Sequence, residues 1–138
     1  MTASLISQAF KKCKKEGRPA LLTYTVAGDP TKKISLDILK SISKNIDIIE
    51  SGMAFSTPIA DGGDIQTSAH RAIKAGINLN ETFKIVKKFK KIEYSKPVIL
   101  MGYWNLILQF NENKFIKMCK KSGVSGCIIV DLPHPENR

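Results

Sequence analysis

Short apolar runs rich in β-branched residues alternate along this chain with longer segments of helical period, and this alternation restricts its fold more than any other feature. Four runs are predicted to be strands, over residues 20–27, 46–50, 98–102 and 126–131. The third and fourth runs are apolar on both faces, as expected for strands buried in a parallel sheet. Strands that alternate with helices in this way form βα units. We therefore predict an α/β fold that contains four such units.

The segments between these strands carry apolar side chains at the spacing of one helix face. A leading helix is predicted over residues 1–16, because Gly17 is a typical helix terminator. The other predicted helices cover residues 34–43, 64–74, 79–92 and 111–121. The connection over residues 51–63 is longer than the usual βα loop of about two to six residues, which favours a functional role.

Two carboxylates stand out near the end of the second predicted strand, where catalytic groups of parallel α/β folds collect. Glu50 closes an apolar run, and burial among apolar groups favours the protonated form that a general acid needs. Asp61 lies in the long loop before Gly62 and Gly63, which permit a tight turn. From spacing alone, a helix cap or a surface turn is the more frequent role of such residues.

The formal net charge of +10 raises the possibility of a nucleic-acid binder. However, the densest lysine runs, 11–15 and 87–91, fall on amphipathic helical segments, where lysine occupies the solvated face. No interleaving of aromatic and basic residues of the single-strand binding type is present in the sequence. We therefore expect no nucleic-acid partner.

The cysteines indicate neither a disulfide framework nor a metal site, because Cys13, Cys119 and Cys127 are odd in number and far apart. Cys127 lies inside an apolar run and is expected to be a small buried residue. The two histidines, His70 and His134, are also too far apart to suggest a metal site, so none is expected. We expect a cytoplasmic protein without export signal or membrane-spanning segment.

A longer motif changes the weight of Glu50 and Asp61. The stretch over residues 49–62, IESGMAFSTPIADG, resembles the active-site motif of tryptophan synthase alpha subunits. Similar family blocks occur in the same order, in RPA at 18–20 leading to AGDP at 27–30, in LMGY at 100–103 and in VDLP at 130–133. The resemblance covers the whole chain. It implies a (β/α)₈ TIM barrel, with residues 1–138 as its N-terminal half: a leading helix and the first four βα units.

In this family the reaction is a retro-aldol cleavage of indole-3-glycerol phosphate to indole and glyceraldehyde 3-phosphate. The resemblance implies that Glu50 delivers and accepts the proton at C3 of the indole ring. It implies that Asp61 accepts a hydrogen bond from the indole nitrogen and stabilises its developing positive charge.

Four further residues fall where the family lines its indole pocket, namely Tyr24, Met101, Tyr103 and Ile128. The resemblance implies no cofactor or metal for this chain. Pyridoxal phosphate is expected only on the beta subunit, which receives the indole through a tunnel in an α₂β₂ heterotetramer.

The chain also departs from the family pattern. Thr57 replaces an acidic residue that pairs with the beta subunit, and Ala54 and Gly63 replace prolines. The family barrel has about 250 residues, and its phosphate site lies in the second half, so we expect negligible activity from residues 1–138 alone. The alternative is a noncatalytic half-barrel that binds a beta subunit or itself through open sheet edges.

Overall fold

The computed structural model describes residues 4–132. Its elements follow the predicted alternation of strands and helices. In chain order they are α1 (Leu5–Lys15), β1 (Leu22–Val26), α2 (Lys32–Ser43), β2 (Ile48–Gly52), α3 (Gly63–Lys74), α4 (Leu79–Lys90), β3 (Val98–Gly102), α5 (Trp104–Phe110), α6 (Glu112–Ser122) and β4 (Gly126–Ile129).

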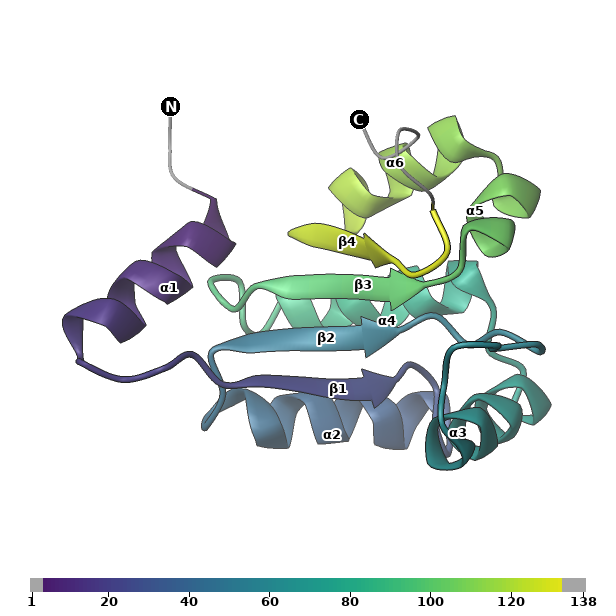
Figure 1. Cartoon of the computed structure of the whole chain (residues 1–138), viewed down its shortest axis with the longest axis horizontal. Helices are drawn as coiled ribbons and strands as arrows, with labels where there is room; N and C mark the ends of the chain where they lie inside the picture. The colour runs from purple at the N-terminus through teal and green to yellow at the C-terminus, as the bar shows by residue number, and fades with distance from the viewer. Residues whose placement is uncertain (1–3, 133–138) are drawn as a thin grey trace.

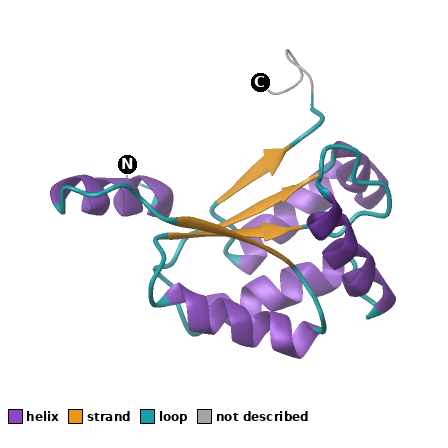
Figure 2. Cartoon of the chain, turned by 60° about the horizontal axis from the view of Figure 1, so that its bottom comes forward, coloured by secondary structure: helices purple, strands orange, loops and turns teal. Residues whose placement is uncertain are grey.

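The four strands form one parallel sheet in the order β1-β2-β3-β4, which confirms the predicted α/β fold (Figure 1). Helices α2 and α4 lie side by side against one face of the sheet, and α6 packs against α4. Helix α1 lies beyond the end at which the strands begin, whereas α3 and α5 lie at the end to which the strands point (Figure 1 and Figure 2). This second end is where a parallel sheet presents its loops to a ligand.

Side chains at the helix termini explain several of these boundaries. The caps of α1, α2, α4 and α6 each accept a hydrogen bond from a backbone N–H in the first turn; they are Ser4, Thr31, Asn78 and Asn111. Helix α6 ends at Gly123, whose φ of 83° is a left-handed conformation that glycine adopts without steric cost. The chain then turns back into β4.

The hydrophobic core lies between the sheet and helices α2, α4 and α6. Its sheet side consists of Ile49, Val98 and Leu100, which are all fully buried. On the helix side, the ring of Phe83 packs against Phe110 and Phe115 at centroid distances of 5.9 and 5.6 Å. Burial of such side chains contributes about 1.5–3 kcal/mol each relative to leaving them in water.

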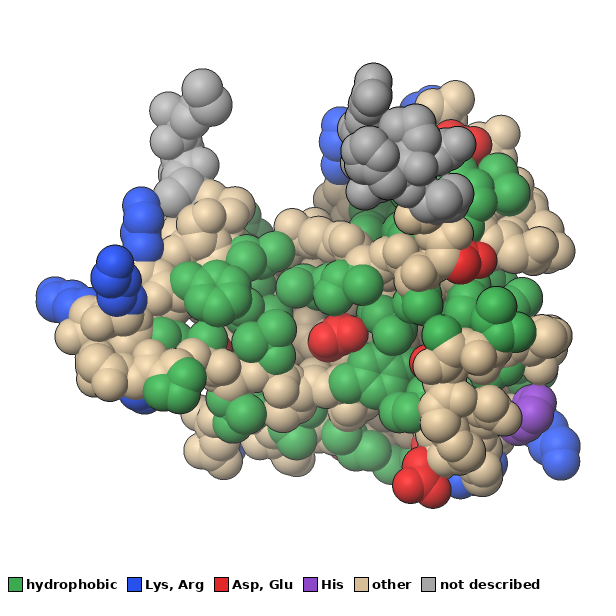
Figure 3. All heavy atoms as spheres, viewed as in Figure 1, with side chains coloured by type: hydrophobic (Ala, Val, Ile, Leu, Met, Phe, Trp, Pro, Cys, Tyr) green, Lys and Arg blue, Asp and Glu red, His purple; other side chains and the backbone are tan. Residues whose placement is uncertain are grey.

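The face of the sheet that α2 and α4 leave uncovered is termed the open face. Figure 3 shows hydrophobic side chains gathered on this face around an acidic group. Leu22 and Ile128 remain 39% and 42% exposed there. At the start of the strands α1 reaches this face, since a Cβ built on Gly126 would lie 3.2 Å from Ile6. An exposed apolar surface of this kind marks an interaction or ligand-binding region.

Several sequence predictions are corrected by the structure. The second strand spans Ile48–Gly52 rather than 46–50, and the fourth ends at Ile129 rather than at 131. Helix α5, Trp104–Phe110, was not predicted. Cys127 is exposed rather than buried, because β4 is an edge strand with no further neighbour among the described residues.

No helix within residues 4–132 is long and apolar enough to cross a membrane.

Candidate active site

Strand register brings four of the six predicted site residues onto the open face. Tyr24 pairs with Glu50 across β1 and β2, and Met101 pairs with Ile128 across β3 and β4. Gly52 lies beside Met101 in the same register row. Neighbours in a parallel register point to the same side of a sheet, and alternate residues of one strand share a face. Tyr24, Glu50, Met101 and Ile128 therefore surround one region of the open face.

The sequence predicted that Glu50 ends the second strand. In the structure Glu50 lies in the middle of β2. The strand continues because Ser51 and Gly52 are paired on both sides. The backbone N–H of Ala27 donates to the carbonyl of Gly52 at 3.0 Å, and that of Met53 donates to Met101 at 2.8 Å. Glu50 is consequently held on a rigid strand and is half-buried. The backbone of Glu50 is therefore fixed beside that of Tyr24, its partner in the strand register.

The side chain of Tyr24 lies directly across Gly52. A Cβ built on Gly52 would lie 2.1 Å from the Tyr24 hydroxyl oxygen, so this position leaves no room for a larger residue while the ring stays in place. Burial raises the pKa of Tyr24 to about 12, with further contributions from the negative charges of Asp61 and Glu50. The Tyr24 hydroxyl is thus near both candidate catalytic carboxylates.

Tyr103 follows β3 and is almost completely buried, with 2% exposure. Its hydroxyl oxygen accepts a hydrogen bond from the backbone N–H of Ala60 at 2.9 Å. Its ring packs against Phe55 at a centroid distance of 5.3 Å. Burial raises the pKa of Tyr103 although the Ala60 N–H opposes the shift, and the nearby Asp61 carboxylate raises it further. Tyr103 therefore contacts the loop at two points before Asp61, at Phe55 and at Ala60.

The loop backbone around Asp61 has two more supports. The N–H of Asp61 donates to the carbonyl of Pro58 at 3.2 Å, which closes a tight turn. The side-chain amide of Gln66, in the first turns of α3, donates to the carbonyl of Asp61 at 2.9 Å. The Asp61 side chain itself is half-buried. These contacts fix the backbone from which the Asp61 carboxylate projects.

Asp29 fixes α3 to the end of β1, a contact that the sequence pattern did not predict. Its carboxylate accepts two hydrogen bonds from Arg71, at 2.8 and 2.7 Å, and one from the hydroxyl of Ser68 at 2.5 Å. The Arg71 guanidinium lowers the pKa of Asp29, and the Ser68 hydroxyl lowers it as well. Since α3 begins directly after the Asp61 loop, this bridge holds the helix to which that loop is attached.

A second carboxylate at a strand end has a comparable structural role. Asp131 follows β4 and accepts a hydrogen bond from the backbone N–H of Trp104 at 2.6 Å. Trp104 is the first residue of α5, and the preceding Tyr103 supplies no side-chain cap. Asp131 therefore provides the missing N-terminal cap from a distant part of the chain. The sequence placed Asp131 at the end of the fourth predicted strand. In the structure its carboxylate caps helix α5.

No group of three or more histidine, cysteine, aspartate or glutamate side chains that could hold a metal ion occurs within the described part of the chain. His134, which was considered as a possible metal ligand, lies outside the described residues.

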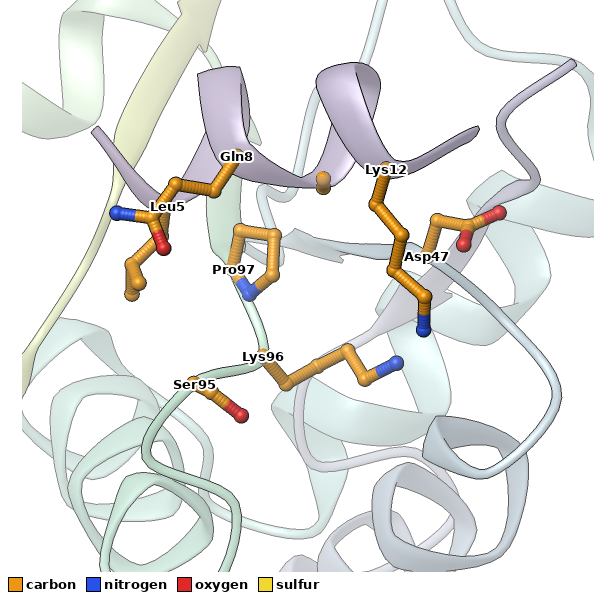
Figure 4. A pocket seen from close by; sticks show the side chains of 8 residues that line it. Leu5, Gln8, Lys12, Asp47, Ser95, Lys96 and Pro97 are labelled. Carbon is orange, nitrogen blue, oxygen red and sulfur yellow. The ribbon is translucent and has the colours of Figure 1, made fainter. Parts of the chain in front are cut away.

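A hollow lies at the opposite end of the strands, between α1 and the segments that enter β2 and β3 (Figure 4). Its lining includes Lys12, Asp47 and Lys96. In α/β barrels this end generally serves stability, whereas chemistry occurs at the other end.

Comparison with known proteins agrees with this geometry. The family model described as tryptophan synthase alpha chain matches residues 10–138. The chain belongs to the tryptophan synthase alpha chain family. A curated tryptophan synthase alpha chain from Pelagibacter ubique (strain HTCC1062) is 65% identical over 135 residues. That alignment covers 98% of this chain and 51% of the relative, so the chain spans about half the length of the curated relative it matches.

Solved structures of the tryptophan synthase alpha family superpose closely on the chain. Tryptophan synthase subunit alpha from Legionella pneumophila str. Paris gives a TM-score of 0.92 at 33% identity, over 96% of this chain and 51% of that one. The tryptophan synthase a2b2 complex from Pyrococcus furiosus gives 0.79 at 43% identity, over 83% and 48%. The described sheet and helices thus correspond to part of the TIM barrel that the family resemblance implied.

Proposed function

We propose that this chain supplies the acid/base half of a tryptophan synthase alpha lyase active site. The reaction would be the retro-aldol cleavage of indole-3-glycerol phosphate to indole and glyceraldehyde 3-phosphate, a step of tryptophan biosynthesis. One observation carries the proposal. Strand register places Glu50 of β2 beside Tyr24 on the open face, and the hydrogen bond between Ala60 and Tyr103 holds the loop that carries Asp61 against the end of β3.

In this proposal Glu50 protonates C3 of the indole ring, which weakens the bond from C3 to the glycerol phosphate chain. As that bond breaks, the hydroxyl of the substrate's glycerol phosphate chain releases a proton. Glu50 takes up this proton, which regenerates the carboxyl group of Glu50. A residue on a paired strand suits this role, because proton transfer requires a fixed distance to the reacting atom. The half-buried position of Glu50 between β1 and β3 supports it.

Asp61 would accept a hydrogen bond from the indole N–H, where positive charge develops as C3 is protonated. A carboxylate placed in advance at such a position lowers the barrier electrostatically. The Tyr103–Ala60 and Gln66–Asp61 hydrogen bonds hold the loop for this purpose. Tyr24, Met101 and Ile128 would form the walls that receive the indole ring.

The proposal includes the partner and the setting. The Pyrococcus furiosus relative forms an a2b2 complex, and we extend this arrangement to the present chain, with a tryptophan synthase beta subunit as its partner. The lyase step would use side chains alone, and pyridoxal phosphate would be confined to the beta subunit. A cytoplasmic location accords with the three cysteines, which are all free thiols.

The test is indole release from indole-3-glycerol phosphate by this chain joined to the C-terminal half of a family member. Glu50→Gln and Asp61→Asn should each lower kcat by about 100-fold or more. Asp37→Asn is the matched control, because Asp37 is an exposed carboxylate on α2 that pairs with Lys40. A well-folded chimera without activity, or one in which either catalytic substitution leaves kcat unchanged, would refute the proposal.

A second function is favoured by the open face itself, on which Leu22 and Ile128 remain exposed. A noncatalytic half-barrel would use this surface and the free edges of β1 and β4 to bind a beta subunit or a second copy. Sedimentation of the 138-residue chain, alone and with a family beta subunit, tests this alternative. A monomer that does not sediment with the beta subunit would exclude it.

A further inference from the structure

A groove in the outer helical layer gathers four lysines around one glutamate. Helices α2 and α4 lie side by side there, on the face of the sheet opposite the open face (Figure 1). The groove between them has a volume of about 290 Å³. Both of its walls are helices of the described chain, so its shape does not depend on what lies beyond β1 or β4.

Each helix contributes two lysines to the groove. Lys32 and Lys33 are the first two residues of α2, and Lys84 and Lys88 are four residues apart on α4. Residues at this spacing share one face of a helix, so the two lysines of α4 lie on the same side of it. The groove therefore has ammonium groups on both walls.

Glu81 is the only acidic side chain among the residues that line the groove, and it bridges the two helices. One of its carboxylate oxygens lies 3.2 Å from Lys32 Nζ, and the other lies 2.6 Å from Lys84 Nζ. The hydrogen bond from Lys84 lowers the pKa of Glu81, and the one from Lys32 lowers it further. Four lysines against one glutamate leave the groove with a formal charge of +3.

The lysines of α2 occupy positions that are unfavourable for the helix itself. A helix N-terminus carries partial positive charge, which favours acidic residues in the first turn and disfavours lysine. Helix α2 has no acidic residue in its first turn. Within residues 4–132, neither Lys33 nor Lys88 takes part in an ion pair. A bound anion would therefore relieve repulsion that the chain itself leaves in place.

The apolar part of the lining strengthens such an interaction. Ile85, which is 3% exposed, and the half-buried Leu36 line the groove together with the lysines. An anion between the two helices would be partly withdrawn from water, where charges interact more strongly than in bulk solvent.

We propose that the groove between α2 and α4 binds a small anion with two or more linked phosphate groups, held by lysines of both helices. Lysine binds phosphate as a point charge, and a chain of phosphate groups can reach ammonium groups on both walls at once. The site is separate from the proposed lyase site, because Glu50 lies on the other face of the sheet. The anion would tie α2 to α4 and would stabilise the folded chain.

The test is calorimetric titration of the 138-residue chain with inorganic tripolyphosphate at low salt. We expect saturable binding at one site, binding that weakens as salt is added, and a higher unfolding temperature in the presence of the anion. Orthophosphate should bind about tenfold more weakly, because it carries fewer charges. ATP without magnesium is the second arm. Equal affinity for ATP would assign the phosphate chain alone as the ligand, and tighter binding would assign a nucleotide.

Lys33→Gln and Lys88→Gln should each raise the Kd for tripolyphosphate by about twofold to fivefold, and the double variant should raise it by about tenfold. Glu81→Gln should lower this Kd, because it removes a repelling charge and frees Lys32 and Lys84. A merely structural role of the Glu81 bridge would not tighten anion binding.

Lys11→Gln is the matched control, because it makes the same charge change at an exposed position on α1, beyond the other end of the strands. Circular dichroism checks the fold of each variant. Absence of saturable binding to the folded chain, an equal loss with Lys11→Gln, or a Glu81→Gln variant that binds more weakly would each overturn the proposal. Tighter binding of a polyglutamate peptide than of tripolyphosphate would also overturn it, since that result would assign the groove to an acidic polypeptide.

Discussion

The hydroxyl oxygen of Tyr103 accepts a hydrogen bond from the backbone N–H of Ala60, the residue immediately before Asp61, at 2.9 Å. This contact joins the end of β3 to a loop that follows β2. Tyr103 was expected from the family resemblance to line the indole pocket. Its 2% exposure and its hydrogen bond indicate that it also positions the loop that carries Asp61.

Tyr103→Phe should therefore weaken the active chimera without changing the ring that packs on Phe55. The loss of one partly buried hydrogen bond is worth about 1 kcal/mol, and we expect kcat to fall by roughly fivefold to tenfold. The measurement is steady-state indole release, with urea unfolding in parallel. Tyr94→Phe is the control, because Tyr94 is 80% exposed. Equal effects of the two substitutions would contradict a positioning role for Tyr103.

A second prediction concerns the close approach of Tyr24 to Gly52. Gly52→Ala would place a methyl group 2.1 Å from the Tyr24 hydroxyl oxygen, so either the ring or the strand must move. We expect a loss of about 1–3 kcal/mol in the free energy of unfolding. Tyr24→Leu removes the obstacle, and the double variant should lose less than the sum of the two single variants. Additive losses in urea titrations would show that the ring and Gly52 do not contact in solution.

The sequence was sufficient for the features that depend on local periodicity and on the positions of strands. All four strands were predicted within two residues of their observed bounds, and five of the six described helices within four residues, since each carries its own apolar pattern. The second strand was displaced because Ser51 and Gly52 resemble loop residues. Only their pairing with β1 and β3 shows that the strand continues through them.

Features that depend on distant contacts were not accessible from the sequence. Helix α5 is seven residues long and has no cap of its own, and Asp131 supplies one from 27 residues further along the chain. The bridge from Asp29 to Arg71 spans 42 residues. Cys127 was predicted to be buried because its run is apolar, but it is exposed on β4, the last strand of the described sheet. Glu50 and Asp61 were first selected by their position near the end of a predicted strand, and the family motif then suggested their catalytic roles.

A third prediction concerns stability in acid. The side-chain hydrogen bonds from Arg18 lower the pKa of Asp47, and the backbone N–H of Leu21 lowers it further. A depressed folded-state pKa contributes stability that is present above the unfolded value of about 4 and is lost as the pH falls below it. Asp47→Asn should therefore remove part of the acid dependence. The measurement is the urea midpoint between about pH 6 and pH 3, and a variant with the same slope as wild type would contradict the assignment.

The raised pKa of Tyr24 yields the last prediction, because it reports directly on the two candidate catalytic carboxylates. Burial, Asp61 and Glu50 together raise the pKa of Tyr24 to about 12, so its neutral form is stabilised by folding. That contribution to stability is present below the unfolded value of about 10 and is lost as the pH rises through the folded value. Titration of tyrosinate absorbance should show a step near 12 that Tyr24→Phe removes. Asp61→Asn and Glu50→Gln should each move this step to lower pH, since each removes a negative charge from the surroundings of the hydroxyl. Asp37→Asn, far away on α2, should leave it in place. A Tyr24 step that neither substitution moves would mean that the two carboxylates do not converge on this hydroxyl, which would contradict the proposed arrangement of the site.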